Sequence, residues 1–527
     1  MKSRGVIEKK KYHLDFIILI VILAIFAITF WYLSYYRNML YSLSADEGIF
    51  LYGAKRVLDG QIIYRDFFSY FFPGNYYLLV FIYKLFGYSF LVARGALVII
   101  DSIINVLVFY LSYKTVRAWY AILPPLFFLI LGFPNWMQFS HFWNGDLFLL
   151  LSLISLLWFL EKNKRYYLYS AAVLLGFTTL FQQAAGVYGV ILFTVILLLT
   201  KHKEPKFLRN MIYFFVWIAV PIAAMFGYIA LKGGLGDFIE QQKFIVLHVY
   251  PHVAAFSPFL FIFNKAYPIN ILIGIYFFSS IVAAGALPLM YKKMPAPVIV
   301  TIAGNLILLL TISYSLDVEH IATAIPLFLI LVLLPVQYTL SYTKAHNQYI
   351  YKLLYYLSGI AGIFLLVWGG SSIEGNIKRI QTHAYSLDIN GVRVWTFDKQ
   401  KAEHIQSFMN TAPFILLDHR HVFVYPYAPL IYVFMHYENP TRYDFIYIQL
   451  GREGADSYIL RDIINELQQK HVHYLIKHGW PQRYTQMLMS LKHITPYPNV
   501  LDEFVQSHYT ALWTLGEYGI LQIRTIP

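Results

Sequence analysis

Cysteine is absent from the chain, so a disulfide framework, a thiol nucleophile and a cysteine-bound metal cluster are all excluded. Charge is scarce as well. Asp, Glu, Lys and Arg make up 13% of the residues, whereas about 25% is usual in a soluble domain. Hydrophobic residues reach 58% and aromatic residues 19%, and residues 16–30 carry no charge. This composition is typical of a polytopic membrane protein.

The net charge of +13 would also fit a nucleic-acid-binding protein, but its distribution does not. Lys and Arg occur mostly in short loops between apolar runs and do not follow one helix face or groove. We interpret them as a membrane-topology signal and expect no nucleic-acid partner. The basic residues 9–11 precede the first apolar run, which is as long as a full span and is not followed by a small-residue cleavage site. We therefore expect an uncleaved first helix.

The apolar segments predict an α-helical polytopic membrane protein. A span needs about 20 mostly apolar residues, and about eleven segments approach this length. Two of them, at 119–133 and 145–160, are short and would be tilted or sunk in the bundle. The segments are 14–34, 89–112, 119–133, 145–160, 166–183, 186–200, 210–231, 268–290, 296–313, 320–338 and 350–369.

Basic residues alternate from loop to loop, as the positive-inside rule requires. The basic loops are at 9–11, 114–117, 162–165, 201–209, 292–293 and 344–352, and the other side has 35–88, 134–144, the turn at Gln182, 232–267 and 314–319. This pattern predicts a multi-pass protein of the plasma (inner) membrane. Its N-terminus would be cytoplasmic, and everything after residue 370 would be extracytoplasmic.

The long insertions all belong to the less basic side, where we therefore expect the functional face. Loop 35–88 contains two amphipathic stretches, at 47–58 and 75–86, that predict interfacial helices. Residues 1–370 are expected to form a transmembrane domain with external loops 35–88 and 232–267. Residues 371–527 have a soluble composition and predict a small α/β domain. The expected strands are 392–397, 414–417, 422–424 and 474–476, and the expected helices are 399–410, 430–436 and 457–470.

The pair Asp46-Glu47, just beyond the first span, is the most informative local feature. Adjacent carboxylates at an apolar boundary attract a cation or a hydroxyl donor. The alternative is structural: Ser44 would cap the following helix, and Glu47 would occupy the capping-box position.

The wider sequence favours the functional interpretation. Residues 44–66 (SADEGIFLYGAKRVLDGQIIYRD) are followed by Phe72-Pro73-Gly74, by Leu85-Phe86-Gly87, and by Arg94 early in the second span. This order resembles the first external loop of the GT-C glycosyltransferases, a class that includes protein O-mannosyltransferases and aminoarabinose transferases. The number of spans, the short third and fourth helices and the external tail are similar too.

The resemblance implies specific roles for the acidic residues. The first-loop aspartate of this class is a catalytic base, so Asp46 would remove the proton of the acceptor hydroxyl while its oxygen attacks the anomeric carbon. The phosphate would leave from the opposite face, which inverts the configuration. Glu47 would orient the base or bind a metal, with a purely structural role as the alternative.

Two further carboxylates are candidates. Asp146, at the mouth of the fourth span, matches the place of a second acidic residue in the class, and its alternative is a favourable charge at a helix start. Asp66 is the other. Asp46 and Asp146 are also the candidate ligands of a divalent ion. The histidines of this face lack the His-x-x-x-His spacing of a metal site on one helix.

The donor phosphate needs cations or backbone donors. Some relatives have charged residues before the loop proline, whereas residues 70–72 here are aromatic. The remaining candidates are Arg94, Lys243, His248, His252 and His320, each with a structural ion pair or interfacial anchor as the alternative. Residues 244–263 resemble the mobile loop that covers the lipid donor in this class; the alternative is an interfacial aromatic belt.

The sequence thus predicts an inverting glycosyltransferase that moves a sugar from a polyprenyl-phosphate donor to a hydroxyl of a protein, lipid or glycan. The alternatives are a transporter or flippase of lipid-linked sugars and a non-catalytic scaffold. Transporters often have internal repeats and broken helices at mid-membrane, whereas these carboxylates cluster in external loops.

Overall fold

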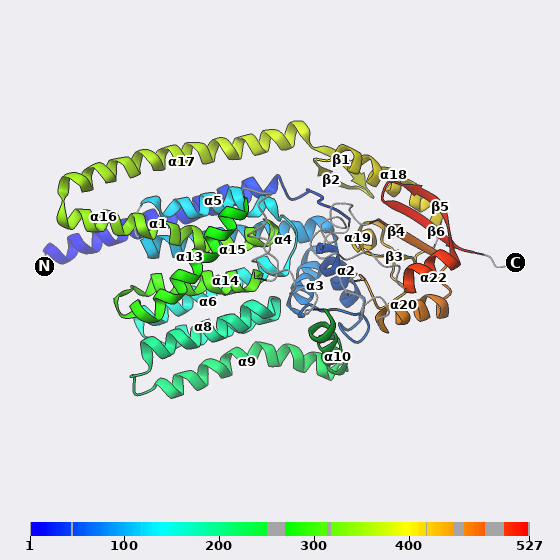
Figure 1. Cartoon of the computed structure of the whole chain (residues 1–527), viewed down its shortest axis with the longest axis horizontal. Helices are drawn as coiled ribbons and strands as arrows, with labels where there is room; N and C mark the ends of the chain where they lie inside the picture. Colours follow the sequence, from blue (N-terminus) through cyan, green and yellow to red (C-terminus); the bar gives the residue numbers. More distant parts are fainter. Residues whose placement is uncertain are drawn as a thin grey trace.

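The computed structural model describes residues 2–43, 46–116, 119–249, 269–313, 318–417, 419–446, 458–479 and 500–524. A bundle of long helices occupies one part of the molecule, and shorter helices with a small sheet occupy the other (Figure 1). The two chain ends lie at opposite extremes of this long axis (Figure 1).

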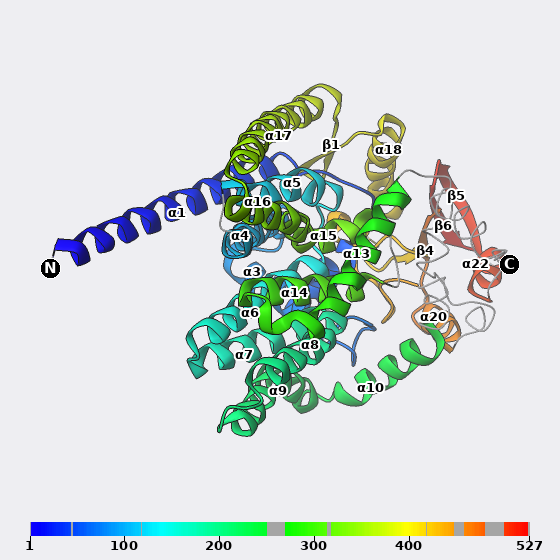
Figure 2. The ribbon, with the colours of Figure 1, turned by 60° about the vertical axis from the view of Figure 1, so that its left-hand side comes forward.

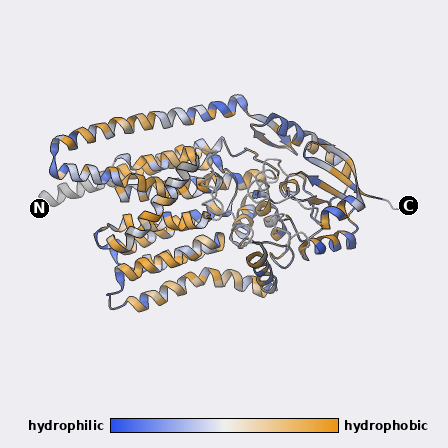
Figure 3. Cartoon of the chain, in the orientation of Figure 1, coloured by the Kyte–Doolittle hydropathy of each residue, from blue (hydrophilic) through white to orange (hydrophobic). Residues whose placement is uncertain are grey.

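Each predicted apolar segment coincides with helical structure. The bundle helices are α1 (Lys2–Ser34), α4 (Phe90–Val116), α5 (Leu123–Leu131) between the short helices η1 (Trp119–Ile122) and η2 (Phe133–Asn135), α6 (His141–Lys162), α7 (Arg165–Phe181), α8 (Gln183–Lys201), α9 (Phe207–Leu231), α13 (Ile269–Met290), α14 (Ala296–Ile312), α15 (Val318–Val332), α16 (Leu334–His346) and α17 (Gln348–His383). Among the described residues, seven helices are long and apolar enough to cross a membrane. Hydrophobic residues cover the bundle along most of its length (Figure 3).

The helix α6 lies at the centre of the bundle. Its span is 72% buried, against 6% for α17, and it packs against α4, α7 and α14. Ser140 caps its start by accepting a hydrogen bond from the Phe142 backbone N–H at 3.2 Å. Asn163 ends it in the left-handed conformation, with φ 53°, that Asn tolerates. The candidate residue Asp146 is therefore carried by the most enclosed of these seven long helices.

The first loop contains both expected interfacial helices, α2 (Glu47–Leu58) and α3 (Gly74–Phe86). They lie at the same end of the bundle as α10 (Leu235–Phe244), the short helix η3 (Ile245–Val249) that continues α10, and the C-terminal part (Figures 1 and 2). The described parts of the two long loops therefore lie at the same end of the molecule, as expected.

The C-terminal part combines a hairpin with a mixed sheet. Strands β1 (Tyr385–Ile389) and β2 (Val392–Thr396) pair antiparallel. The second sheet has the order β3-β4-β6-β5, in which β3 and β4 are parallel and the other pairs are antiparallel. Its members are β3 (Phe423–Tyr425), β4 (Tyr474–His478), β5 (Tyr509–Leu515) and β6 (Tyr518–Ile523), and the helices are α18 (Lys399–Leu416), α19 (Leu430–Met435), α20 (Tyr458–Gln469) and α22 (Val500–His508).

Two local expectations for this part need correction. Residues 414–417 were expected to form a strand, but α18 continues across Pro413 to Leu416, where Ala412 and Leu416 pack into the core. The hairpin β1–β2 was not expected, although Asn390-Gly391 signals it. Both residues have positive φ, 50° and 78°, as a tight type I′ turn requires.

The C-terminal part packs directly on the first loop. The Leu40 backbone N–H donates a hydrogen bond to the Trp395 carbonyl at 2.8 Å, and Arg56 and Asp444 form a buried ion pair at 2.6 Å. Gly48 permits a close approach of the two backbones, since a Cβ there would lie 2.5 Å from the Leu430 nitrogen. The hydrophobic core continues through both parts. The helix α17 extends to His383, beyond residue 370, before the first strand begins.

Candidate active site

Asp46 is the residue immediately before α2, at the junction of the first loop and the C-terminal part. Its backbone carbonyl accepts a hydrogen bond from the Ile49 N–H at 3.0 Å, but its side chain makes no capping bond. Instead, Oδ1 accepts a hydrogen bond from the hydroxyl of Tyr427. Asp46 is partly exposed. Ser44, the alternative cap, lies outside the described residues. A partly exposed carboxylate is therefore held in place by a residue 381 positions away.

Glu47 and Arg94 form a fully buried ion pair between α2 and α4. The Arg94 Nε and Nη2 atoms donate to the two carboxylate oxygens of Glu47 at 2.5 and 2.7 Å, and the two side chains are 0–1% exposed. Glu47 also accepts from the Phe139 backbone N–H at 2.9 Å, while Arg94 donates to the Met137 carbonyl. A bidentate pair of guanidinium and carboxylate stabilises the contact and also fixes the relative orientation of the two side chains.

This pairing bears on three interpretations of the sequence. The capping-box interpretation involves Ser44, which lies outside the described residues; within the described part, the Glu47 carboxylate is directed at Arg94. Arg94 was a candidate phosphate ligand, but its guanidinium is engaged by Glu47 and a main-chain carbonyl. The pair ties the start of α2 to α4 and to the segment before α6, so it positions the neighbouring Asp46.

Asp146 lies inside the bundle on α6 and is 2% exposed. Its Oδ2 has no hydrogen-bond partner among the described residues. Asp101, on α4, is 0% exposed, both of its oxygens are likewise without such a partner there, and it interacts electrostatically with Asp146. Burying carboxylates in this way costs free energy, so two together point to function. Asp101 was not identified from the sequence, although a carboxylate within an apolar span was the signal.

Two histidines and several aromatic rings lie beside these helices. His141 contacts the rings of Phe71 and Phe142, with centroids 4.8 and 4.2 Å apart. His320, on α15, packs edge-on against Trp136 and Phe142 at 4.9 and 5.0 Å. The two imidazoles therefore share one aromatic neighbour, Phe142, which places the predicted candidate His320 beside the N-terminal end of α6.

An aromatic wall connects this region to the C-terminal part. The Tyr70 and Phe71 rings are tilted by 33° with their centroids 4.0 Å apart, and Tyr70 meets Phe445 edge-on at 5.2 Å. Phe445 in turn contacts Tyr427 at 6.5 Å. The uncharged residues before Pro73 thus form part of the wall, and Tyr427 joins it to Asp46.

The other candidates lie apart from Asp46 or outside the described side chains. Asp66 accepts hydrogen bonds from Arg65 at 2.8 Å and from the Ile62 N–H at 2.7 Å, and the Arg65 guanidinium holds the pKa of this carboxyl below its ordinary value. Lys243 is exposed on α10. His248 belongs to η3, but its side chain is not described. His252 and most of loop 244–263 lie outside the described residues.

A divalent ion held by Asp46 and Asp146 stays a prediction. Asp46 is partly exposed and accepts a hydrogen bond from Tyr427 where the first loop meets the C-terminal part, whereas Asp146 is enclosed on α6 and interacts with Asp101. Among the residues that the structure describes, no group of three or more His, Cys, Asp or Glu side chains could hold a metal ion.

Comparison with known proteins places this geometry in a known fold. No protein-family model matches the chain, and no curated protein matches it. Among solved structures, the crystal structure of ArnT from Cupriavidus metallidurans bound to undecaprenyl phosphate is similar, with a TM-score of 0.54 and 13% identity. The match covers 95% of this chain and 97% of ArnT.

The chain therefore has the GT-C-like fold that the sequence predicted. Its fold is similar to that of ArnT over nearly its whole length. The apolar helices and this fold together define an integral membrane protein.

Proposed function

We propose that the protein is a glycosyltransferase that moves a sugar from a polyprenyl-phosphate donor to a hydroxyl acceptor. The observation that carries this proposal is the partly exposed Asp46, fixed by Tyr427 at the mouth of a GT-C-like bundle. The likeness to ArnT, whose crystal structure contains undecaprenyl phosphate, supports a lipid-linked donor. Apolar helix surfaces such as α1 and α17, which are only 22% and 6% buried, provide the membrane setting from which such a donor is taken.

Asp46 acts as the general base in this proposal. Its carboxylate takes the proton of the acceptor hydroxyl, and the resulting oxygen nucleophile forms a bond to the anomeric carbon of the sugar. The bond from that carbon to the phosphate oxygen breaks on the opposite face, and polyprenyl phosphate leaves with the electron pair. The configuration is inverted. A positioned base of this type contributes about 10²–10⁴-fold to a rate.

The surrounding contacts support the role of Asp46. The buried Glu47–Arg94 pair fixes the start of α2, and the Tyr427 hydroxyl fixes the orientation of the carboxylate. A base held in this way needs little reorganisation in the transition state. The aromatic wall formed by Tyr70, Phe71 and Phe445 offers stacking surfaces for a sugar ring beside it. His320 and Lys243 stay candidates for the donor phosphate.

The active face is proposed to be extracytoplasmic. The basic turns that carry Lys201, Lys203 and Lys292 lie at the end of the bundle opposite the C-terminal part (Figure 1). Positive charge favours the cytoplasmic side. Asp46, α2, α3 and α10 would then face the outside.

The decisive experiment compares Asp46→Asn with the wild type in membranes supplied with labelled polyprenyl-phosphate sugars and a panel of hydroxyl acceptors. Asp59→Asn is the matched control, because Asp59 ends the same helix in an exposed pair with Lys55. We expect transfer to fall at least 100-fold in Asp46→Asn and to persist in Asp59→Asn. Unchanged transfer in Asp46→Asn would remove Asp46 as the base.

A flippase of lipid-linked sugars is the second candidate, and the buried carboxylates favour it. Asp101 and Asp146 lie within spans, where ionisable groups often mark a transport path. In proteoliposomes, a flippase would move labelled donor across the bilayer without transferring its sugar, and Asp101→Asn would stop this movement. A transferase would release polyprenyl phosphate at a rate that depends on Asp46.

A further inference from the structure

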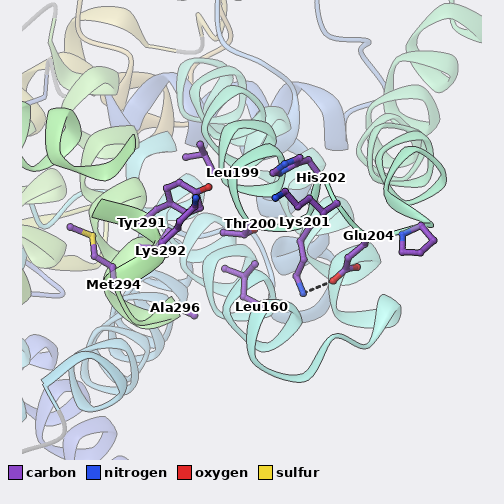
Figure 4. A pocket seen from close by; sticks show the side chains of 13 residues that line it. Leu160, Leu199, Thr200, Lys201, His202, Glu204, Tyr291, Lys292, Met294 and Ala296 are labelled. Atoms are coloured by element: carbon purple, nitrogen blue, oxygen red, sulfur yellow. Dashed lines mark hydrogen bonds and ion pairs between the residues drawn. The ribbon is translucent and has the colours of Figure 1, made fainter. Parts of the chain in front are cut away.

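The basic end of the bundle contains a cavity far from the candidate active site. Its volume is about 870 Å³, within the range of small-molecule sites. It lies between the end of α8, the turn from α8 to α9, and the turn from α13 to α14 (Figure 4). These turns are at the opposite end of the molecule from the C-terminal part (Figure 1).

The charge around the cavity is predominantly positive. Lys201, Lys203 and Lys292 line it together with a single carboxylate, Glu204. Glu204 is already paired with Lys201 at 2.9 Å, an interaction drawn in Figure 4. Lys203 and Lys292 are exposed, and neither forms an ion pair within the part of the chain that the structure describes. Two cations from different turns therefore remain for an anionic ligand.

The turn that carries Lys203 is fixed before any ligand arrives. Besides its bond to Glu204, Lys201 Nζ donates to Asn163 Oδ1 at 3.1 Å, and Asn163 donates to Glu204 at 3.3 Å. This network ties the turn to the end of α6. A site whose frame is already ordered loses less conformational entropy on binding.

The rest of the cavity lining is mixed, because apolar side chains lie beside Thr200, His202 and Tyr291. Leu160, Leu199 and Met294 contribute to its lining, and Figure 4 shows them with the lysine and tyrosine side chains around one opening. The helix α8 also exposes Val187, Ile191 and Leu198, which are 47–53% exposed, along its outer side. A ligand with an anionic head and an apolar body would satisfy both kinds of surface, whereas a free anion would use only the lysines.

We propose that this cavity binds the phosphate headgroup of an anionic phospholipid from the leaflet at the basic end of the bundle. Lys203 and Lys292 contact the phosphate, and the acyl chains lie along the apolar surface of α8. Basic pockets between membrane helices recognise lipid headgroups by this combination of charge and hydrophobic contact.

The test uses the full-length protein in detergent and native mass spectrometry with phosphatidylglycerol or phosphatidylcholine. The wild type is compared with the double variant Lys203→Gln/Lys292→Gln. The control variant is Lys164→Gln/Lys206→Gln, which removes the same charge from exposed residues of the same end outside the cavity. Thermal unfolding of the lipid-free samples establishes that both variants fold.

We expect the wild type and the control to retain phosphatidylglycerol in preference to phosphatidylcholine. The cavity variant should lose this preference, by roughly fivefold per lysine removed. Equal losses in both variants would overturn the proposal, because binding would then follow overall surface charge. It would also be overturned if millimolar inorganic phosphate displaced the lipid, or protected the lipid-free protein against heat as well as the lipid does. The readout needs no sugar transfer, so its failure is distinct from that of Asp46→Asn.

Discussion

The hydroxyl of Tyr427 donates a hydrogen bond to the Asp46 carboxylate, which joins the C-terminal part of the chain to the start of α2. The two residues are 381 positions apart. The C-terminal part is thus more than a cap on the bundle, since it supplies a direct partner of the proposed base.

Removing this hydroxyl should impair the chemical step and leave the fold intact. A hydrogen bond to a charged group contributes about 1.5–3 kcal/mol, so Tyr427→Phe should lower kcat roughly tenfold or more. The measurement is single-turnover transfer from a labelled lipid-linked donor. Tyr385→Phe, at an exposed position of β1, is the control and should keep its activity. Equal rates for both variants would show that Tyr427 does not support the base.

The Glu47–Arg94 pair should matter for stability above all. Removing one partner of a buried ion pair costs about 3–5 kcal/mol, because the other charge is left uncompensated. Arg94→Ala and Glu47→Ala should each lower the unfolding temperature strongly. Arg94→Lys should recover little of the lost stability, since an ammonium group cannot form the bidentate contact with the Glu47 carboxylate.

The control for this pair is Lys55→Ala, which breaks an exposed pair on the same helix and should cost at most about 1 kcal/mol. Unfolding is followed by the loss of monodisperse protein on heating in detergent. A direct phosphate-binding role for Arg94 would give the opposite pattern: a raised KM for the donor with an unchanged unfolding temperature.

Asp66 should make the stability of the first loop dependent on acid pH. Its hydrogen bond with Arg65 holds the pKa of the folded state below the ordinary value of 3.8. A lowered pKa means that the contribution is present above the unfolded-state pKa and is lost as the pH falls through the folded-state pKa. Asp66→Asn should therefore be less stable than the wild type at pH 7. The difference in unfolding temperature should shrink below about pH 4, and a constant difference would contradict this account.

The orientation can be tested cleanly because the chain contains no cysteine. Lys164→Cys places a thiol at the basic end, and Lys399→Cys places one on α18, where Lys399 is 67% exposed. A membrane-impermeant maleimide should label Lys399→Cys in intact cells. It should label Lys164→Cys only after permeabilisation, and the reverse pattern would place the proposed active face in the cytoplasm.

Most of the helices could be predicted from the sequence because their signals are local. Runs of apolar residues gave the spans, and amphipathic patterns gave α2 and α3, since a helix needs only its own residues to satisfy its backbone hydrogen bonds. The signal failed at residues 414–417, where an apolar run after Pro413 suggests a strand. Packing against the surrounding core keeps these residues helical instead. Tertiary packing therefore overrides the local preference for a strand, and the sequence of one segment does not reveal that packing.

The sequence by itself determined the membrane character of the chain and drew attention to Asp46. Only the tertiary structure decided how the acidic residues are used. It joins Glu47 to Arg94, 47 positions later, brings Tyr427 to Asp46, and encloses Asp101 with Asp146. These relationships depend on which surfaces meet when distant segments pack together, because a carboxylate buried with a guanidinium and one left exposed look alike in a linear sequence.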